Sequence, residues 1–422
     1  MQGTYLLNSS KDLEPILNRI GDAHCVMLGE ASHGTHEYYT WRTALSKRLI
    51  EEKGFHFIAV EGDWPDFYVL NHYVKKYGTE NKDLHTLLHS FRRWPTWMWA
   101  NWEVYALVDW LRNYNEGKLI EKKVGIYGLD VYSLWDSIAA MNAYLSKHDT
   151  EAATIIVRVL QCFEPFDEDV YKYARKQHFI TSSCRKELVE LLSTIRRKAM
   201  KYDNDPEASL NMEQNAHTAV DAEAYYTEMV ALSDNTWNMR DKHMMETLQR
   251  LIQFHGKNTK VIVWAHNTHV GDARYTDMRN EGHFNIGQLA REEFGEQDVV
   301  LVGFGSYAGS VIAATQWGAP MQVMYMPEAR SGSFEQLMHH RSKKNRLIIF
   351  EKEKDFLYEN TISHRAIGVV YNPERERYGN YVPSILASRY DVFIYLDETL
   401  ALHPLHLTPD TTKIPETYPF SV

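Results

Sequence analysis

The stretch Val26–Tyr39 reads Val-Met-Leu-Gly-Glu-Ala-Ser-His-Gly-Thr-His-Glu-Tyr-Tyr. It begins as a short apolar strand, Cys25–Leu28, which breaks at Gly29. Glu30 and His33 then lie in a loop, before a helical pattern opens. Open α/β sheets place their chemistry at the carboxyl ends of buried strands. We therefore expect Glu30 and His33 to belong to a functional site.

Two glycines, Gly29 and Gly34, flank this loop. Glycine tolerates backbone angles that other residues avoid, so both positions predict a loop that brings polar groups close to a ligand. The residues of this loop are equally compatible with a simple strand-to-helix turn in which Thr35 is the N-cap and His33 is only exposed. The residues of the loop alone leave both interpretations open.

Length and composition describe an ordinary globular protein. The chain has 422 residues, of which 44% are hydrophobic and 24% charged, so it can bury a large core. Its formal net charge of −10 argues against a general nucleic-acid or anionic-membrane surface. No signal peptide and no apolar run of about 18 residues is visible, which predicts a cytoplasmic protein.

Three cysteines, Cys25, Cys162 and Cys184, are widely spaced along the chain. Because Cys25 lies in an apparent core strand, we expect all three to be reduced, structural thiols.

Short apolar runs alternate with helical patterns at both ends of the chain. Strands are expected at 25–28, 56–60, 123–127, 260–265, 298–304, 346–350, 366–371 and 392–396. Helical periodicity dominates from about 133 to 255. The pattern predicts an α/β fold with a mainly parallel sheet flanked by helices and a large inserted helical subdomain. The expected limits are 1–132 for the first part of the α/β core, 133–255 for the helical subdomain and 256–422 for the second part.

Polar side chains stand where four of the predicted strands end: Glu30 with His33, Glu61, Asp130, and His266 with His269. If these strands are parallel and adjacent, their carboxyl ends converge, and the side chains meet in one cleft.

An unusually aromatic segment runs from 92 to 105 and contains Trp94 and Trp97. Such a cluster could line an apolar substrate pocket. It could equally be core packing under a loop, which is the commoner role of buried aromatic residues.

The motif Leu28-Gly29-Glu30-Ala31-Ser32-His33-Gly34-Thr35, followed by Glu37 and Arg42, resembles the opening motif of the erythromycin esterase family. Later segments resemble family landmarks in the same order: Glu61 after an apolar strand, 94–101, Gly128-x-Asp130, Arg240-Asp241 and 264–270. The match spans roughly residues 25 to 310. The resemblance implies six catalytic positions, namely Glu30, His33, Arg42, Glu61, His266 and His269. Substrate contacts are expected from Trp94, Trp97, Asn101, Asp130 and Arg240.

A family of this kind implies hydrolysis of carboxylic esters or lactones. No Gly-x-Ser-x-Gly elbow supports a serine nucleophile, and Ser32 is a poor candidate beside His33. We expect His33 to be the general base toward water, with Glu30 or Glu61 holding its other ring nitrogen. Arg42 and His266 or His269 would stabilise the oxyanion or protonate the leaving alkoxide. No metal and no cofactor are expected.

Two alternatives use the same residues. Three of His33, His36, His266 and His269, with Glu30 and Glu61, could hold a catalytic zinc ion, or the chain could bind a small molecule without turnover. The sequence does not specify the substrate. A macrolide lactone or another ester would suit, and some family members carry names linked to succinylated polysaccharide synthesis. Nucleic-acid and membrane partners are not expected, and the sequence does not indicate an oligomeric state.

Overall fold

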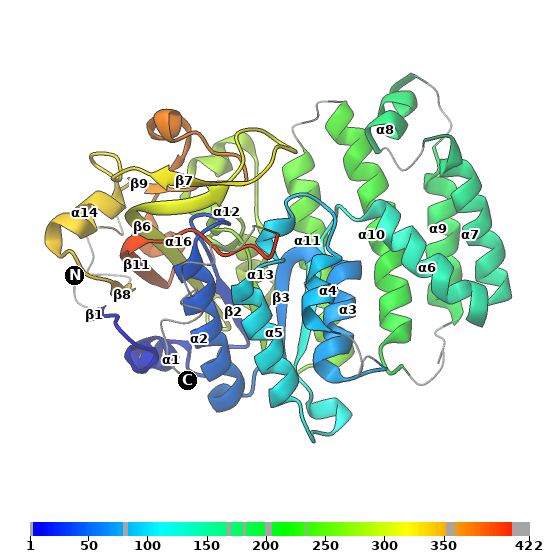
Figure 1. Cartoon of the computed structure of the whole chain (residues 1–422), viewed down its shortest axis with the longest axis horizontal. Coiled ribbons are helices and arrows are strands. Elements are labelled where there is room, and N and C mark those ends of the chain that lie inside the picture. The colour runs from blue at the N-terminus through cyan, green and yellow to red at the C-terminus, as the bar shows by residue number, and fades with distance from the viewer. Residues whose placement is uncertain are drawn as a thin grey trace. The chain divides into compact units, whose positions relative to one another are not determined.

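The computed structural model describes residues 3–78, 83–166, 170–179, 183–198, 205–231, 233, 235–351, 357 and 360–406. It divides into two compact units. Unit 1 comprises 1–59, 73–125 and 258–422, and unit 2 comprises 60–72 and 126–257. Figure 1 traces the chain by colour, so that the blue N-terminal and the yellow to red C-terminal segments can both be followed in unit 1.

Unit 1 is built on a mainly parallel sheet. Its strand order is β1-β8-β11-β6-β2-β5, and β7 pairs with β6 outside this order. Strands β2, β5, β6 and β11 are parallel, whereas β1, β7 and β8 pair antiparallel. The strands concerned are β1 (Thr4–Leu6), β2 (Cys25–Leu28), β5 (Val261–Trp264), β6 (Val299–Ala313), β7 (Gln322–Met326), β8 (Arg346–Ile349) and β11 (Val392–Thr399).

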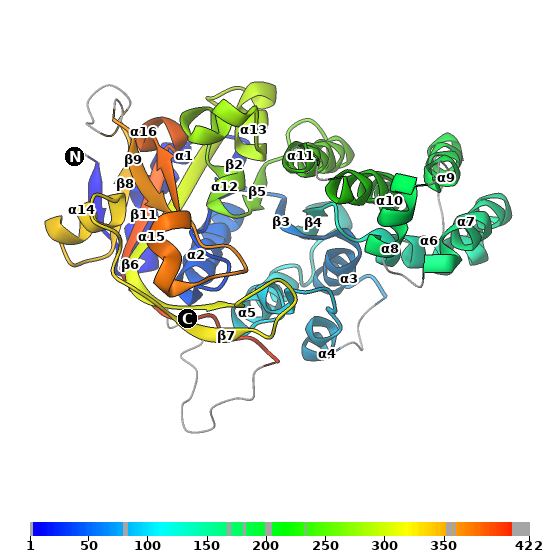
Figure 2. The ribbon, with the colours of Figure 1, turned by 90° about the horizontal axis from the view of Figure 1, so that it is seen from above.

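Helices cover both faces of this sheet. In Figure 2, strands β2 and β5 lie between α2 on one side and α13 on the other. The helices of unit 1 are α1 (Glu14–Ile20), α2 (His36–Lys53), α4 (Leu84–His89), α5 (Trp102–Tyr114), α12 (Asn267–Val270), α13 (Ile286–Phe294), α14 (Phe334–Arg341), α15 (Glu376–Gly379) and α16 (Leu386–Arg389). The expected α/β class, with a mainly parallel sheet flanked by helices, is confirmed.

Helix α2 follows the local signals in the sequence. It begins after Thr35, which has an extended backbone, and ends at Gly54, whose left-handed conformation (φ 70°) suits a residue without a side chain. Apolar side chains at helical spacing, among them Tyr38 and Leu45, are buried. Trp264 of β5 donates its indole N–H to Ser46 of α2 (3.0 Å), which fixes the helix on the sheet.

One expected strand, at 366–371, is wrong. The chain instead forms β9 (Ile362–Arg365), which pairs antiparallel with β10 (Tyr381–Ser384). Within 366–371, Ile367 bridges to Ser32 and Val370 bridges to Ala314. The backbone groups of this apolar run therefore pair with separate partners and make no continuous ladder.

Two strands run from unit 1 into unit 2. They are β3 (Phe57–Asp63) and β4 (Gly125–Asp130). Both extend farther than the sequence pattern predicted, so Glu61 and Asp130 lie within strands rather than beyond them.

The rest of unit 2 is helical, and the bounds of its helices are α3 (Trp64–Lys75, whose last residues belong to unit 1), α6 (Leu134–His148), α7 (Thr150–Phe163), α8 (Val170–Phe179), α9 (Arg185–Lys198), α10 (Ala208–Val230) and α11 (Thr236–His255). Helix α10 contacts α6, α8, α9 and α11. Helices α6 to α10 share an apolar core, in which Ile138, Ile156, Leu191 and Ala219 are each at most 1% exposed. The three-part division at 132/133 and 255/256 stays a prediction.

The expectation of three reduced cysteines is wrong for two of them. Cys162, near the end of α7, forms a disulfide with Cys184, just before α9. Their separation of 22 residues gives no spacing motif, and they meet because α7 packs against α9. Cys25 is free and buried in β2, as expected.

Among the helices of the described residues, none combines the length and the apolar character needed to cross a bilayer.

Candidate active site

The strand register brings two of the predicted segments together. In the parallel pair β2–β5, Leu28 lies opposite Trp264. Glu30 and His266 each come two residues after this pair, and the contact continues there, because Asn267 N–H donates to the carbonyl of Glu30 (2.8 Å). The carboxyl ends of β2 and β5 therefore present Glu30 and His266 side by side, where an open sheet places its ligands.

The glycines of the motif serve close packing. Neither Gly29 nor Gly34 has a positive φ, so the expectation of special backbone angles is wrong. A Cβ on Gly29 would lie 2.1 Å from Oδ1 of Asn267, and one on Gly34 would lie 1.9 Å from the carbonyl oxygen of Ile312. These positions exclude a side chain because the backbone of the motif loop presses against its neighbours.

Glu30 holds two of the predicted residues at once. Its Oε1 lies 2.9 Å from Nδ1 of His33, and its Oε2 accepts from Nη2 of Arg42 (2.6 Å). Glu30 is 1% exposed, and His33 is 7% exposed. The interpretation of His33 as an exposed turn residue is therefore wrong.

The guanidinium of Arg42 is enclosed by aromatic rings. Its central carbon lies 4.4 Å from the ring centre of Tyr39 and 4.6 Å from that of Trp264. Arg42 is fully buried, and its Nε and Nη1 have no hydrogen-bond partner among the described residues. Glu30 is thus the carboxylate that balances this buried charge.

His266 completes the group of predicted residues that unit 1 brings together. Its ring centre is 4.9 Å from that of His33, and its Nδ1 lies 2.8 Å from Oγ1 of Thr268. His269 is buried in α12, the short helix that His266 caps. Asn267, between them, exchanges hydrogen bonds with the backbone of Phe304 in β6 (2.6 and 3.2 Å) and so anchors the segment.

The hydroxyl of Ser32 is not directed at His33. It pairs with the hydroxyl of Thr35, and both residues are buried. Thr35 occupies the N-cap position of α2, but its side chain makes no capping bond.

The aromatic segment contributes mainly to the interior. Trp97 is 1% exposed, whereas Trp94 is half-buried, with its ring 4.6 Å from that of Trp317. Asn101 caps α5 by accepting from Val104 N–H (2.8 Å), and its amide group donates to the carbonyls of Trp97 and Met98. The substrate contacts expected of these residues stay predictions.

Unit 2 gathers the remaining predicted residues. Arg240 donates to Glu61 (2.5 Å) and makes a two-point ion pair with Asp130 (2.9 and 2.8 Å). Its guanidinium carbon also lies 5.0 Å from the ring centre of Tyr132. Burial alone would lower the pKa of Arg240, but Asp130, Tyr132 and Glu61 raise it well above its ordinary value. Because Glu61 lies in unit 2 and His33 in unit 1, a shared cleft stays a prediction.

A second polar cluster was missed by the sequence reasoning. His36, Glu103 and His403 are the residues of the described chain that lie close enough together to hold a metal ion. The zinc alternative named His36, but Glu103 and His403 are 67 and 367 residues farther along the chain, so no spacing pattern could have indicated them. Burial would raise the pKa of Glu103, but hydrogen bonds from the two histidines lower it to about 2.

Comparison with known proteins gives the family. The family model for erythromycin esterase matches residues 50–399, which is most of the chain. The chain belongs to the erythromycin esterase family. It is 24% identical over 374 residues to erythromycin esterase type II of Escherichia coli, covering 80% of this chain and 83% of that protein. It is 23% identical to the putative hydrolase YbfO of Bacillus subtilis (strain 168), covering 95% and 87% of the two chains.

Solved structures show the same fold. A succinoglycan biosynthesis protein superposes with a TM-score of 0.73 at 20% identity, over 95% of this chain and 96% of that one. A mutant of the erythromycin esterase EreC in its open conformation superposes with a TM-score of 0.64 at 15% identity, over 92% and 94%. Membership of the erythromycin esterase family supports a hydrolase of that type.

Proposed function

We propose that this chain hydrolyses carboxylic esters or lactones, with a water molecule that His33 activates and without a metal ion in the reaction. The observation that carries the proposal is the hydrogen-bonded group of Arg42, Glu30 and His33, which lies at the carboxyl ends of the paired strands β2 and β5. An imidazole oriented by a buried carboxylate is the arrangement that general-base hydrolysis requires.

Each residue of this group has a role in the proposed reaction. Donation from Nδ1–H of His33 to Glu30 puts the ring's lone pair on Nε2, which takes a proton from water as the oxygen attacks the acyl carbon. Glu30 stabilises the imidazolium that forms. Arg42 acts as a positioning residue, because its bond to Oε2 fixes the orientation of the carboxylate.

The second half of the reaction needs a donor for the leaving group. When the tetrahedral intermediate collapses, the bond between the acyl carbon and the alkoxide oxygen breaks, and the alkoxide takes up a proton. We assign this proton to the imidazolium of His33, and we assign oxyanion stabilisation to His266 or His269. Nine-tenths burial of His33 and His266 supports the assignment, since charge stabilisation is stronger in a site that excludes water.

Macrolide lactones are one substrate class worth testing, given the name of the Escherichia coli relative. We infer that the substrate is a small-molecule ester or lactone. The decisive experiment is a screen of chromogenic esters and macrolides, with and without a chelator, on the wild type and on His33→Ala. We expect hydrolysis that persists in the chelator and is lost in His33→Ala.

A matched control is available at the other end of β2. His24 is half exposed and pairs with Asp298 (3.2 Å), so His24→Ala removes an imidazole from the same strand region without touching the motif loop. It should keep the wild-type rate. Hydrolysis that stops in the chelator, or that survives in His33→Ala, would contradict the proposal.

A further inference from the structure

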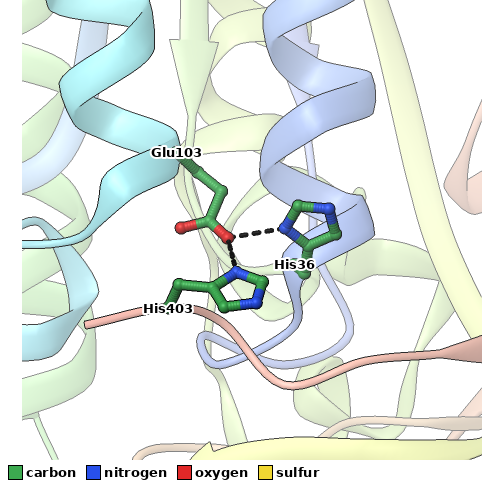
Figure 3. Close-up of side chains that lie close together, drawn as sticks. All are labelled: His36, Glu103 and His403. Carbon is green, nitrogen blue, oxygen red and sulfur yellow. Dashed lines mark hydrogen bonds and ion pairs between the residues drawn. The ribbon is translucent and has the colours of Figure 1, made fainter. Parts of the chain in front are cut away.

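The cluster of His36, Glu103 and His403 joins three segments of unit 1 (Figure 3). His36 is the first residue of α2, Glu103 lies in the first turn of α5, and His403 comes from the C-terminal segment 400–405. Nδ1 of His36 and Nδ1 of His403 both point at Oε1 of Glu103, at 2.5 and 2.6 Å. The two imidazole rings are nearly perpendicular, with centres 5.0 Å apart.

The segment 400–405, which we call the C-terminal strap, is held on both sides by backbone hydrogen bonds. On one side, His36 N–H donates to Leu400 (2.9 Å), and Leu402 N–H donates to Gly34 (2.9 Å). On the other side, Trp102 N–H donates to the carbonyl of His403 (3.0 Å). The three backbones are therefore fixed independently of the three side chains, which makes the cluster a preorganised site.

The second carboxylate oxygen of Glu103 is the independent sign of a ligand. Glu103 is 4% exposed, and its Oε2 is buried with no hydrogen-bond partner among the described residues. A buried carboxylate oxygen that lacks a donor costs free energy, and such groups in folded proteins call for an ion or a water. The side chain of His403 is about one-third exposed (34%), so the cluster is open to solvent on that side.

We propose that His36, Glu103 and His403 bind one divalent transition-metal ion, such as Zn²⁺, which ties the C-terminal strap to the N-termini of α2 and α5. Two imidazoles and a carboxylate are a common protein ligand set for zinc. The candidate ligand atoms lie within 4.8 Å of one another, and ligands at about 2.0–2.2 Å from a tetrahedral zinc are separated by less than that. Coordination through both oxygens would also satisfy Oε2 of Glu103.

Ligation requires each imidazole to carry a single proton, on Nε2, and any second proton is released to solvent. In a neutral imidazole, the proton that Nδ1 now donates to Glu103 moves to Nε2, and the Nδ1 lone pair binds the metal. The ion takes over the role of the two hydrogen bonds and holds the same three side chains together. Small side-chain rotations widen the 2.5 and 2.6 Å contacts to the spacing of metal ligands.

The proposed ion is structural and independent of the proposed hydrolysis. His36 lies three residues after His33, at the start of α2, so the ion would steady the motif loop from the helix side without contacting the reacting water or the substrate. The proposed site also differs from the catalytic zinc site considered from the sequence, because Glu30 and His33 are not among its ligands.

The test uses the full chain, stripped with a chelator and titrated with Zn²⁺ alone. We expect one bound Zn²⁺ per chain by calorimetry and metal analysis, and a higher thermal midpoint in the loaded protein. Glu103→Gln and His403→Ala should each weaken binding at least about 100-fold, since replacing even a group that only supports a metal ligand costs 10–100-fold. Co²⁺ in the same site should give visible absorption that both variants lose.

His406→Ala is the matched control, because His406 is a histidine just past the same strap, with its ring 4.4 Å from that of His89. It should bind Zn²⁺ like the wild type. Circular dichroism reports whether each variant folds, and His403→Gln offers a milder change if His403→Ala does not. Absence of Zn²⁺ binding, or binding that survives in folded His403→Ala, would overturn the proposal. Ester hydrolysis by the stripped protein tests the proposed function separately.

Discussion

Replacing Glu30 by Gln should destabilise the protein through Arg42 more than through His33. Arg42 is fully buried, and Glu30 is the carboxylate to which it donates. Removing one partner of a buried ion pair costs roughly 3–5 kcal/mol, because the other charge stays buried and uncompensated. We therefore expect the free energy of unfolding of Glu30→Gln to fall by about that amount in urea denaturation.

A second substitution separates stability from chemistry. Arg42→Met places an uncharged, unbranched apolar side chain beside the rings of Tyr39 and Trp264. Replacing both members of a buried pair by uncharged groups is often nearly neutral. The double variant Glu30→Gln/Arg42→Met should therefore unfold at a higher urea concentration than Glu30→Gln alone. Its kcat/KM should stay at least about 100-fold below wild type, since His33 still lacks its carboxylate.

The control is an ion pair of the same type at the surface. Glu14 accepts from Arg48 (2.7 Å) but is 59% exposed, so Glu14→Gln should change the free energy of unfolding by no more than about 1 kcal/mol. If Glu30→Gln is as stable as wild type, or if the double variant is no more stable than Glu30→Gln, then the buried pair does not carry the stability assigned to it. Recovered hydrolysis in the double variant would show that Glu30 does not act through His33.

Three further outcomes are expected. His33→Ala should lower kcat/KM by about 10²–10⁴-fold, or roughly 3–5 kcal/mol; near wild-type turnover with earlier unfolding would make His33 structural. Acid should destabilise the fold through the buried pair His364–Glu335 (2.6 Å). Burial lowers the pKa of His364. Burial would raise the pKa of Glu335, but His364 and Arg365 together outweigh it and lower that pKa. The pKa values of both groups are lower in the folded than in the unfolded chain, so the stability they contribute is present at neutral pH and is lost as pH falls below 6.5. The thermal midpoints of wild type and Glu335→Gln should therefore converge in acid. Midpoints that stay equally far apart at every pH would refute this. Reducing the Cys162–Cys184 disulfide, which closes a loop of 22 residues, should lower the free energy of unfolding of unit 2 by about 3 kcal/mol. The control is the double variant Cys162→Ser/Cys184→Ser, whose stability should not change with reductant.

Local order was largely readable from the sequence. The strand Cys25–Leu28 and the start of α2 were predicted from an apolar run and from a polar loop before a helical period, and both are confirmed. These elements depend on contacts within a few residues, so their signals are contiguous in the chain. The prediction of a strand at 366–371 was wrong for the opposite reason. Ile367 and Val370 form isolated bridges to Ser32 and Ala314, and only the tertiary fold determines those partners.

The identity of the side chains at strand ends also came from the sequence, but their pairing could be expected only between residues close along the chain, such as Glu30 and His33. Glu30 and His33 are near in sequence, and a short loop could be expected to bring them together. Arg42 donates to Glu30 because α2 packs on β5, where Tyr39 and Trp264 exclude water from the guanidinium. The disulfide between Cys162 and Cys184 likewise follows from helix packing rather than from spacing.

The sequence by itself indicated the motif, the strand before it, the helix after it and the class of fold. The tertiary structure alone decided that β2 lies beside β5, so that Glu30 meets His266 across a parallel register. It also decided that a segment near residue 403 returns between α2 and α5, where His403 and His36 share Glu103. Such contacts join residues up to 367 positions apart, and they form because backbone groups of distant segments must be hydrogen-bonded once they are buried.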